Sequence, residues 1–469
     1  MSLLRRKQRL QRRSKPDAGH NITILQTKEV QLVTLVCSKN RVDSEHLLRQ
    51  MESVGVEIAD SGFELSSKNR IDAVILNTCG FIKDAKEESI EAILQAVEAK
   101  ELGYVKQVFV FGCLSQRYKD DLEKEIPEVD GFFGAFDWDS ILKALGMAKD
   151  VSLLQQRYLT TPQHYAYLKI SEGCDRTCSY CAIPGIRGKH ISVPMEELVE
   201  EARHLAAKGV RELIVIAQDT TYYGLDLYKR RALGDLLKQL CEIDGIEWIR
   251  IHYSYPDQFP DDVLEIMATN PKICKYIDIP LQHSSTKLLK MMRRSIDGPQ
   301  TQAVLDRIKE KVPGIVIRTT FIVGHPGEDR REFEKLLRFV ERNRFDRLGA
   351  FTYSEEEGTY GALHFKDTVR ESTKQARYEE LMELQSGISL ASNEARVGNV
   401  KRVIVDSFTD GVLVCRSQSE SPEVDGEILI GKKGLGEFAP EQLIGKFVKA
   451  KIVGANEYDL LAELVEVEN

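Results

Sequence analysis

The chain has 469 residues, of which 42% are hydrophobic and 29% are charged, and its formal net charge is −8. This length exceeds what one hydrophobic core normally supports and predicts two to four domains. This proportion of hydrophobic to charged residues is typical of a soluble globular protein. No stretch approaches the roughly eighteen apolar residues that cross a membrane, and the negative charge excludes nucleic-acid binding by overall charge alone.

The N-terminal segment, residues 1–29, is polar and basic and has little hydrophobic periodicity. Its first part carries many cations and no acid: Arg5, Arg6, Lys7, Arg9, Arg12, Arg13 and Lys15. We expect a flexible arm that either is a solvated tail or contacts RNA. The arm lacks the apolar core of a secretory signal, so we expect a cytoplasmic protein in which thiols stay reduced.

Residues 30–150 alternate short apolar runs with helical periodicity. Strands are expected at residues 31–36, 73–76 and 108–111. A helix should begin near Asp43 and Ser44, which are good capping residues, and end near Val54. Strands that alternate with helices predict a parallel sheet covered on both faces, and therefore an N-terminal α/β domain.

Residues 160–395 repeat this alternation over a longer stretch. Strands are expected at residues 166–171, 213–217, 248–252, 276–280, 316–323 and 348–353, with a long closing helix at 371–395. Six such units predict a partial (β/α)₆ version of the TIM-like barrel, open on one side. Residues 398–468 hold only short β-rich runs broken by Gly, Asp and Pro, which predicts a small antiparallel β-barrel.

Three cysteines, Cys174, Cys178 and Cys181, follow the first barrel strand at the spacing C-x₃-C-x₂-C. Barrels place their chemistry in such loops. Three thiolates from one tight loop can bind three irons of a 4Fe–4S cluster and leave the fourth iron open, unlike the four-cysteine run of bacterial ferredoxins. The alternatives are a structural zinc site, with His164 or His190 as fourth ligand, and cysteines that are merely buried.

Three more cysteines, Cys37, Cys79 and Cys113, each follow an expected strand of the N-terminal sheet. The carboxyl ends of parallel strands gather at one edge, where helix N-termini favour thiolates. These positions predict a second cluster, and the alternative is three small core residues. The core reading is preferred for the remaining three: Cys241, Cys274 and Cys415.

The triplet loop resembles that of the radical S-adenosylmethionine superfamily. The resemblance implies that the open iron binds the amino and carboxylate groups of S-adenosylmethionine. An electron from the cluster then cleaves the cofactor to a 5′-deoxyadenosyl radical.

With the other motifs, the resemblance narrows to the methylthiotransferases. The motifs that carry this resemblance are Cys37-Ser-Lys-Asn-Arg-Val-Asp-Ser-Glu45, Asn77-Thr-Cys-Gly-Phe-Ile82, Gly112-Cys113, Tyr276-Ile-Asp-Ile-Pro-Leu-Gln-His283, Thr320-Phe-Ile-Val-Gly-His-Pro-Gly-Glu328 and Tyr353-Ser-Glu-Glu-Glu-Gly-Thr359. The family joins a two-cluster core (residues 30–150 and 160–395) to a TRAM barrel (residues 398–468). Val36 and His325 depart from its usual Gly and Phe, but neither is a cluster ligand.

The resemblance also implies cofactor-binding residues at two strand ends. Gln218, with Asp219, follows the second barrel strand, where radical enzymes contact the methionyl amine. Gln282, with His283, follows the fourth strand. The alternative for each is an ordinary polar loop residue.

Two types within the family compete as interpretations. The RimO type modifies an aspartate β-carbon of ribosomal protein S twelve, and the MiaB type modifies a tRNA adenosine. Residues 396–469 hold nine Lys or Arg and thirteen Asp or Glu, a net charge of −4. An acidic domain suits a basic ribosomal protein better than tRNA phosphates. His252-Tyr-Ser-Tyr-Pro256 and the acidic residues 355–357 also resemble the RimO type.

The RimO interpretation implies several partners. They are ribosomal protein S twelve or the small ribosomal subunit, a reductant such as flavodoxin or ferredoxin, and a sulfur donor, with no membrane. A non-catalytic iron–sulfur assembly factor for the ribosome remains the alternative from a different class.

Overall fold

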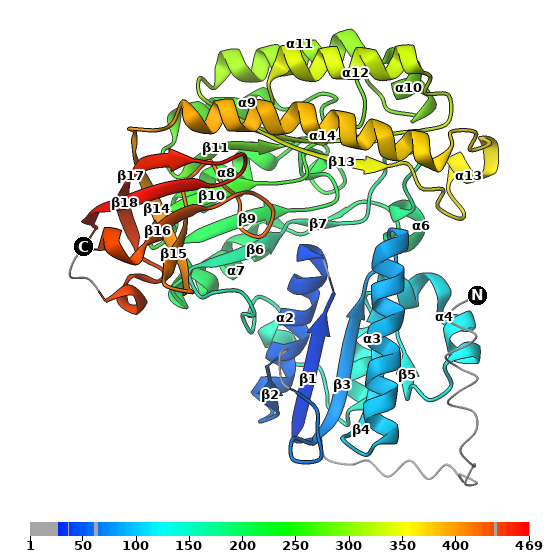
Figure 1. Cartoon of the computed structure of the whole chain (residues 1–469). Helices are drawn as coiled ribbons and strands as arrows, with labels where there is room; N and C mark the ends of the chain where they lie inside the picture. The colour runs from blue at the N-terminus through cyan, green and yellow to red at the C-terminus, as the bar shows by residue number, and fades with distance from the viewer. Residues whose placement is uncertain (1–26, 36, 61–63, 436–438, 469) are drawn as a thin grey trace.

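The computed structural model describes residues 27–35, 37–60, 64–435 and 439–468. Residues 1–26 of the predicted arm, and Val36, therefore lie outside the described residues. The chain forms three main sheets, coloured blue to cyan, green to yellow and orange to red in Figure 1. Among the described helices, none combines the length and the apolar character that crossing a lipid bilayer requires.

The N-terminal sheet is parallel throughout, in the order β2-β1-β3-β4-β5. Its core has two halves, because α2 and α5 pack on one face and α3 and α4 on the other. The strands are β1 (Glu29–Thr34), β2 (Glu57–Ala59), β3 (Ile71–Thr78), β4 (Val105–Gly112) and β5 (Gly131–Phe132). The helices are α2 (Ser38–Ser53), α3 (Lys83–Glu101), α4 (Cys113–Glu125), α5 (Trp138–Ala144) and the short η1 (Val151–Leu153).

Helix α2 begins earlier than predicted, which corrects the capping interpretation of Asp43 and Ser44. Cys37 is its N-cap residue, and Asp43 and Ser44 lie buried inside the helix. Ser44 accepts hydrogen bonds from Thr34 and from Asn77, at 2.7 and 3.0 Å. Their short polar side chains therefore serve tertiary contacts, which outweigh local capping preference.

The second sheet has six parallel strands in the order β6-β9-β10-β11-β12-β13, as a partial barrel requires. The strands are β6 (Tyr165–Lys169), β9 (Glu212–Ile216), β10 (Trp248–Ile251), β11 (Ile273–Asp278), β12 (Val316–Val323) and β13 (Arg347–Thr352). Its helices are α6 (Ile183–Arg187), α7 (Met195–Ala207), α8 (Leu233–Cys241), α9 (Asp261–Thr269), α10 (Thr286–Met291), α11 (Gly298–Lys311), α12 (Arg330–Asn343), α13 (Tyr360–His364) and α14 (Glu371–Glu394). Two short elements lie near the strand ends: the antiparallel pair of β7 (Ser171–Glu172) with β8 (Ile191–Ser192), and the turn η2 (Thr220–Tyr222).

The C-terminal strands close into a barrel in the order β14-β15-β16-β18-β17. The predicted barrel is confirmed, but one pairing, β16 with β18, is parallel. A closed ring of five strands cannot alternate direction all the way round, so one parallel pair is unavoidable. The elements are β14 (Val400–Thr409), β15 (Val412–Arg416), β16 (Ile428–Gly431), β17 (Phe447–Ala455) and β18 (Leu460–Val467), with η3 (Lys432–Leu435) and η4 (Pro440–Leu443).

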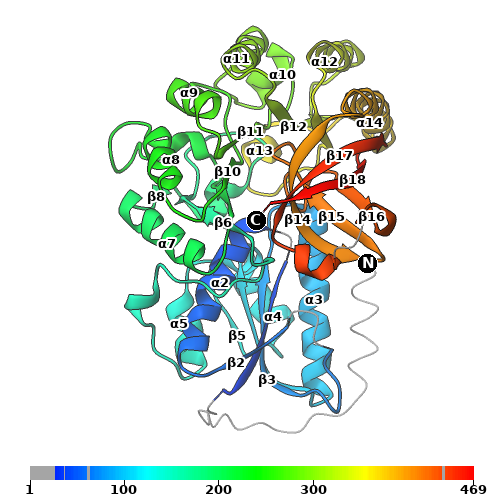
Figure 2. The same ribbon diagram turned by 90° about the vertical axis from the view of Figure 1, so that its left-hand side faces the viewer.

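The loop between β15 and β16, residues 417–427, fills the inner face of the partial barrel near the amino ends of its strands. The Arg250 guanidinium donates to the carbonyls of Ser417 and Gln418, and the Tyr276 hydroxyl donates to Asp425 at 2.7 Å. The C-terminal barrel thus packs at one end of the six-stranded sheet, and α6 and α13 lie at the other end (Figures 1 and 2). Residues at or just after the carboxyl ends of several strands contact the N-terminal domain: Lys169 pairs with Asp43, and Glu356 pairs with Lys86.

Candidate metal centres

The C-x₃-C-x₂-C loop is fixed by backbone hydrogen bonds on several sides. The Cys174 N–H donates to the Gly188 carbonyl at 3.1 Å, and the Ser179 N–H donates to the Met292 carbonyl at 2.9 Å. Gly173, just before the first cysteine, has φ +71°, and a Cβ there would lie 2.0 Å from the Lys189 carbonyl oxygen. The loop conformation therefore requires glycine at this position.

The thiols of this loop lie close enough to influence one another. Burial raises the pKa of Cys174 to about 12, and the neighbouring Cys178 thiol contributes to that rise. Burial likewise raises the pKa of Cys181 to about 12, with Cys178 and Cys174 as further causes. Nucleophilic cysteines have lowered pKa values, whereas a bound metal removes the thiol proton outright. The three side chains are suited to ligation.

Two arginines, one in the triplet loop and one beside it, stack on the ring of one tyrosine. The guanidinium carbons of Arg176 and Arg294 lie 3.9 and 4.3 Å from the centroid of the Tyr255 ring. Arg176 also donates to Asp219 at 2.9 Å, and Arg294 donates to the hydroxyl of Tyr180 at 3.2 Å. This places one buried and one partly buried positive charge at a loop that would carry thiolates, which favours an anionic cluster.

The N-terminal cysteines also converge, each from a different strand end. Cys37 caps α2, Cys79 follows β3 directly, and Cys113 begins α4 directly after β4. Burial raises the pKa of Cys79 to about 12, and the nearby thiols of Cys37 and Cys113 raise it further. Gly112 has φ +102°, and a Cβ there would lie 2.5 Å from the Thr78 carbonyl oxygen. The sheet edge thus brings the three thiols together.

One cysteine of the N-terminal set contacts the segment after the barrel triplet across the boundary between the domains. Cys113 packs with Ala182, the residue after Cys181, and with Ile186 in one small buried cluster. Arg187 at the end of α6 donates from Nε to the Cys113 sulfur at 3.2 Å. Cys113 and the segment that follows Cys181 are therefore in contact across the domain boundary.

Neither histidine proposed as a zinc ligand has a cysteine as hydrogen-bond partner. His164 Nε2 pairs with Asp406 of the C-terminal barrel at 2.7 Å, and His190 Nε2 pairs with Ser192 at 3.0 Å. Within the described ranges, no three His, Cys, Asp or Glu side chains are grouped as a single metal ion requires. A four-iron cluster is larger than one ion and holds its ligands farther apart, so this finding does not bear on it.

The remaining cysteines are core residues, as predicted: Cys241, Cys274 and Cys415 are buried in three different hydrophobic clusters.

Gln218 and Gln282, the predicted cofactor-binding residues, share one property. The side-chain oxygen of each is buried and has no hydrogen-bond partner among the residues that the structure describes. For Gln218 the amide is oriented, because its Nε2 donates to Glu172 Oε1 at 2.6 Å. A buried unpaired acceptor costs stability unless a ligand satisfies it. Both positions therefore fit a ligand with N–H donors, such as the ammonium group of S-adenosylmethionine.

Their neighbours in sequence have structural roles. Asp219 caps η2 and pairs with Arg176. His283 is fully buried and accepts backbone hydrogen bonds from Ser284 and Ser285 through Nδ1. Asp219 and the Nδ1 atom of His283 are thus paired within the fold, whereas His283 Nε2 has no hydrogen-bond partner among the described residues and lies 3.3 Å from Glu328 Oε2.

Sequence reasoning missed the polar residues that join the two cysteine sets. They are Asn40 and Asp43 on α2, Lys169 and Glu172 beside β6 and β7, and Arg187. The only local signal is a Lys and a Glu at a strand end, three residues apart. Their partners on α2 lie more than a hundred positions away, and no periodicity connects them.

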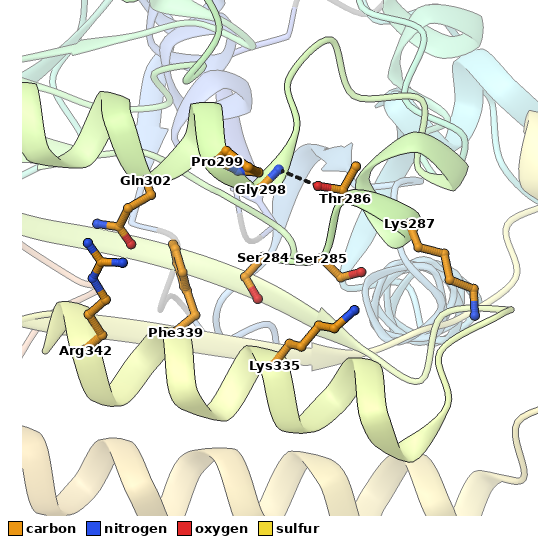
Figure 3. Close-up of a pocket in the computed structure, with 10 residues that line it drawn as sticks. All are labelled: Ser284, Ser285, Thr286, Lys287, Gly298, Pro299, Gln302, Lys335, Phe339 and Arg342. Atoms are coloured by element: carbon orange, nitrogen blue, oxygen red, sulfur yellow. Dashed lines mark hydrogen bonds between the residues drawn. The ribbon is translucent and has the colours of Figure 1, made fainter.

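A cavity of about 340 Å³ opens elsewhere, between α10, α11 and α12 (Figure 3). Three cations line it, and each already has an acidic partner: Lys287 with Asp329, Lys335 with Glu332, and Arg342 with Asp306. None of the predicted site residues is among its lining residues.

Known families match the chain in three consecutive segments. Residues 29–134 match the uncharacterized protein family UPF0004, residues 168–340 match the radical SAM superfamily, and residues 397–465 match the TRAM domain.

Similar proteins include the ribosomal protein uS12 methylthiotransferases RimO of Cytophaga hutchinsonii and Porphyromonas gingivalis. They are 51% and 50% identical over 442 residues, which are 94% of this chain and 99% and 100% of the relatives. The enzyme of the same name from Bacteroides fragilis is 47% identical over 441 residues, with 94% and 100% coverage.

Among solved structures, the radical S-adenosylmethionine methyltransferase TsrM from Kitasatospora setae has a TM-score of 0.53 at 13% identity and covers 72% of this chain and 74% of its own. The cobalamin-dependent enzyme OxsB has a TM-score of 0.51 at 13% identity, with 77% and 56% coverage. At this identity the likeness shows the fold alone.

Proposed function

This chain belongs to the RimO family of radical SAM enzymes that methylthiolate ribosomal protein uS12, and we propose that it places a methylthio group on the β-carbon of one aspartate of that protein. The observation that supports the proposal is the presence of two cysteine sets. Cys37, Cys79 and Cys113 lie at strand ends of the N-terminal sheet, Cys174, Cys178 and Cys181 lie in the loop after β6, and Cys113 contacts the segment that follows this loop. Because its substrate is a ribosomal protein, the proposed place of action is the cytoplasm.

The barrel set would hold a 4Fe–4S cluster with one open iron. When bound there, the cluster supplies coordination for S-adenosylmethionine and the electron that cleaves it. The chain's own residues hold and orient the reactants. The Gln218 side-chain oxygen would accept a hydrogen bond from the methionyl ammonium group, and Gln282 would offer a second acceptor, because neither oxygen has a partner among the described residues. Arg176 and Arg294 offset the negative charge of the thiolates.

The N-terminal set would hold a second cluster, which would supply the sulfur for the transfer. The contacts of the barrel residues Arg187 and Ile186 with Cys113 support separate roles for the two sets within one enzyme. We further propose that a small reductant, such as flavodoxin or ferredoxin, and a separate sulfur donor serve the two sites.

The acidic C-terminal barrel supports a basic protein substrate, although some of its acids are already used internally. Asp425 is buried against Tyr276 and Arg318, and Glu423 pairs with Arg41 at 2.8 Å. These two carboxylates hold domains together, so reversing their charge would test folding and not encounter with substrate. Exposed carboxylates such as Glu457 and Glu463 are the ones available for long-range steering.

The decisive experiment compares two triple variants with the parent protein. Replacing Cys174, Cys178 and Cys181 by Ala should remove about half of the bound iron and all release of 5′-deoxyadenosine. Replacing Cys37, Cys79 and Cys113 by Ala should also remove about half of the iron but leave that release intact. Each sample receives reductant, sulfide, S-adenosylmethionine and either purified uS12 or unmodified tRNA, and the products are analysed by mass spectrometry.

The expected product is uS12 with a methylthio group in place of one hydrogen, localised to an aspartate, and only from the parent protein. Modification of the tRNA alone would assign the chain to nucleoside chemistry. Release of 5′-deoxyadenosine by the first variant would refute the barrel site. If neither substrate changes and no 5′-deoxyadenosine forms even from the parent, the result would favour a non-catalytic iron–sulfur protein that assists ribosome assembly.

A further inference from the structure

One buried arginine touches both halves of the proposed site. The Arg187 side chain is 2% exposed and lies at the end of α6, six residues after the last cysteine of the barrel loop. It has four hydrogen-bonding partners: Cys113 Sγ at 3.2 Å, Asp43 at 3.1 Å, Glu172 at 2.9 Å, and Asn40. Three of the four belong to the N-terminal domain, although Arg187 belongs to the barrel.

The contact with sulfur suits the metal-bound form of the site. A neutral thiol is a poor acceptor for a guanidinium, whereas a thiolate is a charged one. The other cation of the network, Lys169, also contacts Asp43 and Glu172, so two cations face two carboxylates before any thiolate is counted. A cluster held by three thiolates adds negative charge, and Arg187 is the cation that donates to one of those sulfurs.

Glu172 continues the connection into the barrel. Its Oε2 accepts from Arg187 and its Oε1 accepts from Gln218 Nε2 at 2.6 Å. The amide of Gln218 is thereby turned so that its own oxygen is left without a partner. A continuous chain of hydrogen bonds runs from Cys113 through Arg187 and Glu172 to Gln218.

Stability alone does not account for such a network. Buried ion pairs lose much of their attraction to desolvation, and apolar replacements of similar shape are often as stable. A fixed polar bridge does, however, set the orientation and the electrostatics of the groups at its two ends.

We propose that Arg187 and Glu172 are a positioning pair that couples the two cysteine sets: Arg187 holds and tunes the N-terminal cluster through Cys113, and Glu172 orients Gln218 toward S-adenosylmethionine. The inference rests on the proposed function, because it takes the N-terminal cysteines to hold a cluster. It adds residues and a linkage to that function.

The test measures the N-terminal cluster by itself. In the full-length variant with Cys174, Cys178 and Cys181 replaced by Ala, one cluster remains, and its midpoint potential is followed by redox titration with electron paramagnetic resonance. Hydrogen bonds to cluster sulfurs and nearby charge set such potentials. In this background Arg187→Gln should move the potential to more negative values, and Glu172→Gln should move it to more positive values.

Shifts of opposite sign in the two variants would show that these residues set the potential of the cluster electrostatically. A merely structural defect would shift the potential of both variants in the same direction or not at all. Arg187→Lys keeps the charge but not the planar fork, and its potential should fall between those of the parent and Arg187→Gln. If Arg187→Gln does not fold, Arg187→Lys and Glu172→Gln decide. With the barrel cysteines intact, Glu172→Gln should weaken S-adenosylmethionine binding by about tenfold, the loss of one oriented hydrogen bond.

Arg117→Gln is the matched control. Arg117 also bridges the domains, through Glu356 at 3.2 Å and the Gly80 carbonyl, but its hydrogen-bond partners include no cysteine sulfur. It should leave the potential in place. An unchanged potential in Arg187→Gln, or an equal shift in Arg117→Gln, would overturn the inference. A background protein without any cluster would remove the second metal site, and the inference with it.

Discussion

Arg416 is the residue whose loss should most weaken the junction between the partial barrel and the C-terminal barrel. Its side chain is 2% exposed, and it donates to Glu212 at 2.7 Å and through Nη2 to Asp406 at 2.9 Å. Arg416→Met keeps most of the volume and removes the charge. Among the described side chains, Glu212 then keeps Arg250 as its hydrogen-bond donor, and Asp406 keeps His164.

The expected loss of stability is large for one residue. Breaking a buried ion pair by removing one partner costs about 3–5 kcal/mol, because the other charge stays buried. This is more than a hundredfold in the unfolding equilibrium. Arg402→Met at the same junction is the matched control. Its partners, Glu468 and Glu247, are themselves partly exposed, so its loss should cost at most about 1 kcal/mol.

Urea unfolding followed by the fluorescence of Trp248 measures the effect at the junction. Trp248 is 1% exposed and its ring lies 4.7 Å from Phe447 of the C-terminal barrel. The other tryptophan, Trp138, is replaced by Phe in all samples so that one reporter remains. A loss below about 1 kcal/mol in Arg416→Met, or a loss equal to that of Arg402→Met, would refute the reasoning.

The same network predicts a pH dependence of known sign. Burial raises the pKa of Glu212, but Arg416 and Arg250 lower it more, so the pKa lies below its usual value of 4.5 in the folded protein. Stability from this carboxylate is therefore present above about pH 4.5 and is lost as the pH falls through the folded-state pKa. The difference in stability between the parent protein and Arg416→Met should shrink on acidification through that window.

Three further predictions concern the site and its substrate. Gln218→Ala should weaken S-adenosylmethionine binding by about ten- to a hundredfold, the loss of a hydrogen bond to a charged group, measured by equilibrium dialysis, while iron content stays unchanged. Gly173→Ala should prevent binding of the barrel cluster, and Gly112→Ala should prevent binding of the N-terminal cluster, because each change strains a residue with positive φ beside a cysteine. Full iron content in both variants would contradict this prediction. Glu457→Lys with Glu463→Lys should slow encounter with uS12 at low salt and have no effect at high salt, and stopped-flow binding that is equally slow at both would exclude steering.

Much of the fold follows from local pattern. Strand β12 was predicted with its observed limits because all of its residues except Arg318 are β-branched or apolar. Helix α14 differs from the prediction by one residue at its end. Strands β2 and β5 were missed, since segments of three and two residues carry no usable periodicity.

Some residues of the candidate site could likewise be predicted from local sequence, and others could not. The six cysteines could be proposed from spacing and from strand ends, because metal ligands are few in kind and their positions recur. Arg187 could not, because its role depends on Asn40 and Cys113, which are 147 and 74 positions away. The start of α2 was misplaced for a related reason: Asp43 pairs with Lys169 and Arg187 across the domain boundary, which no local capping rule anticipates.

The loop of residues 417–427 has a consequence for engineering relatives of this enzyme. Because Ser417, Glu420 and Asp425 lie inside the six-stranded barrel against Arg250, Arg347 and Tyr276, the C-terminal barrel is not an exchangeable module. A chimaera that takes this barrel from a homologue must also take the inward-facing residues of the strands beneath it. A change of substrate class made by swapping the last seventy or so residues alone would first encounter a folding defect.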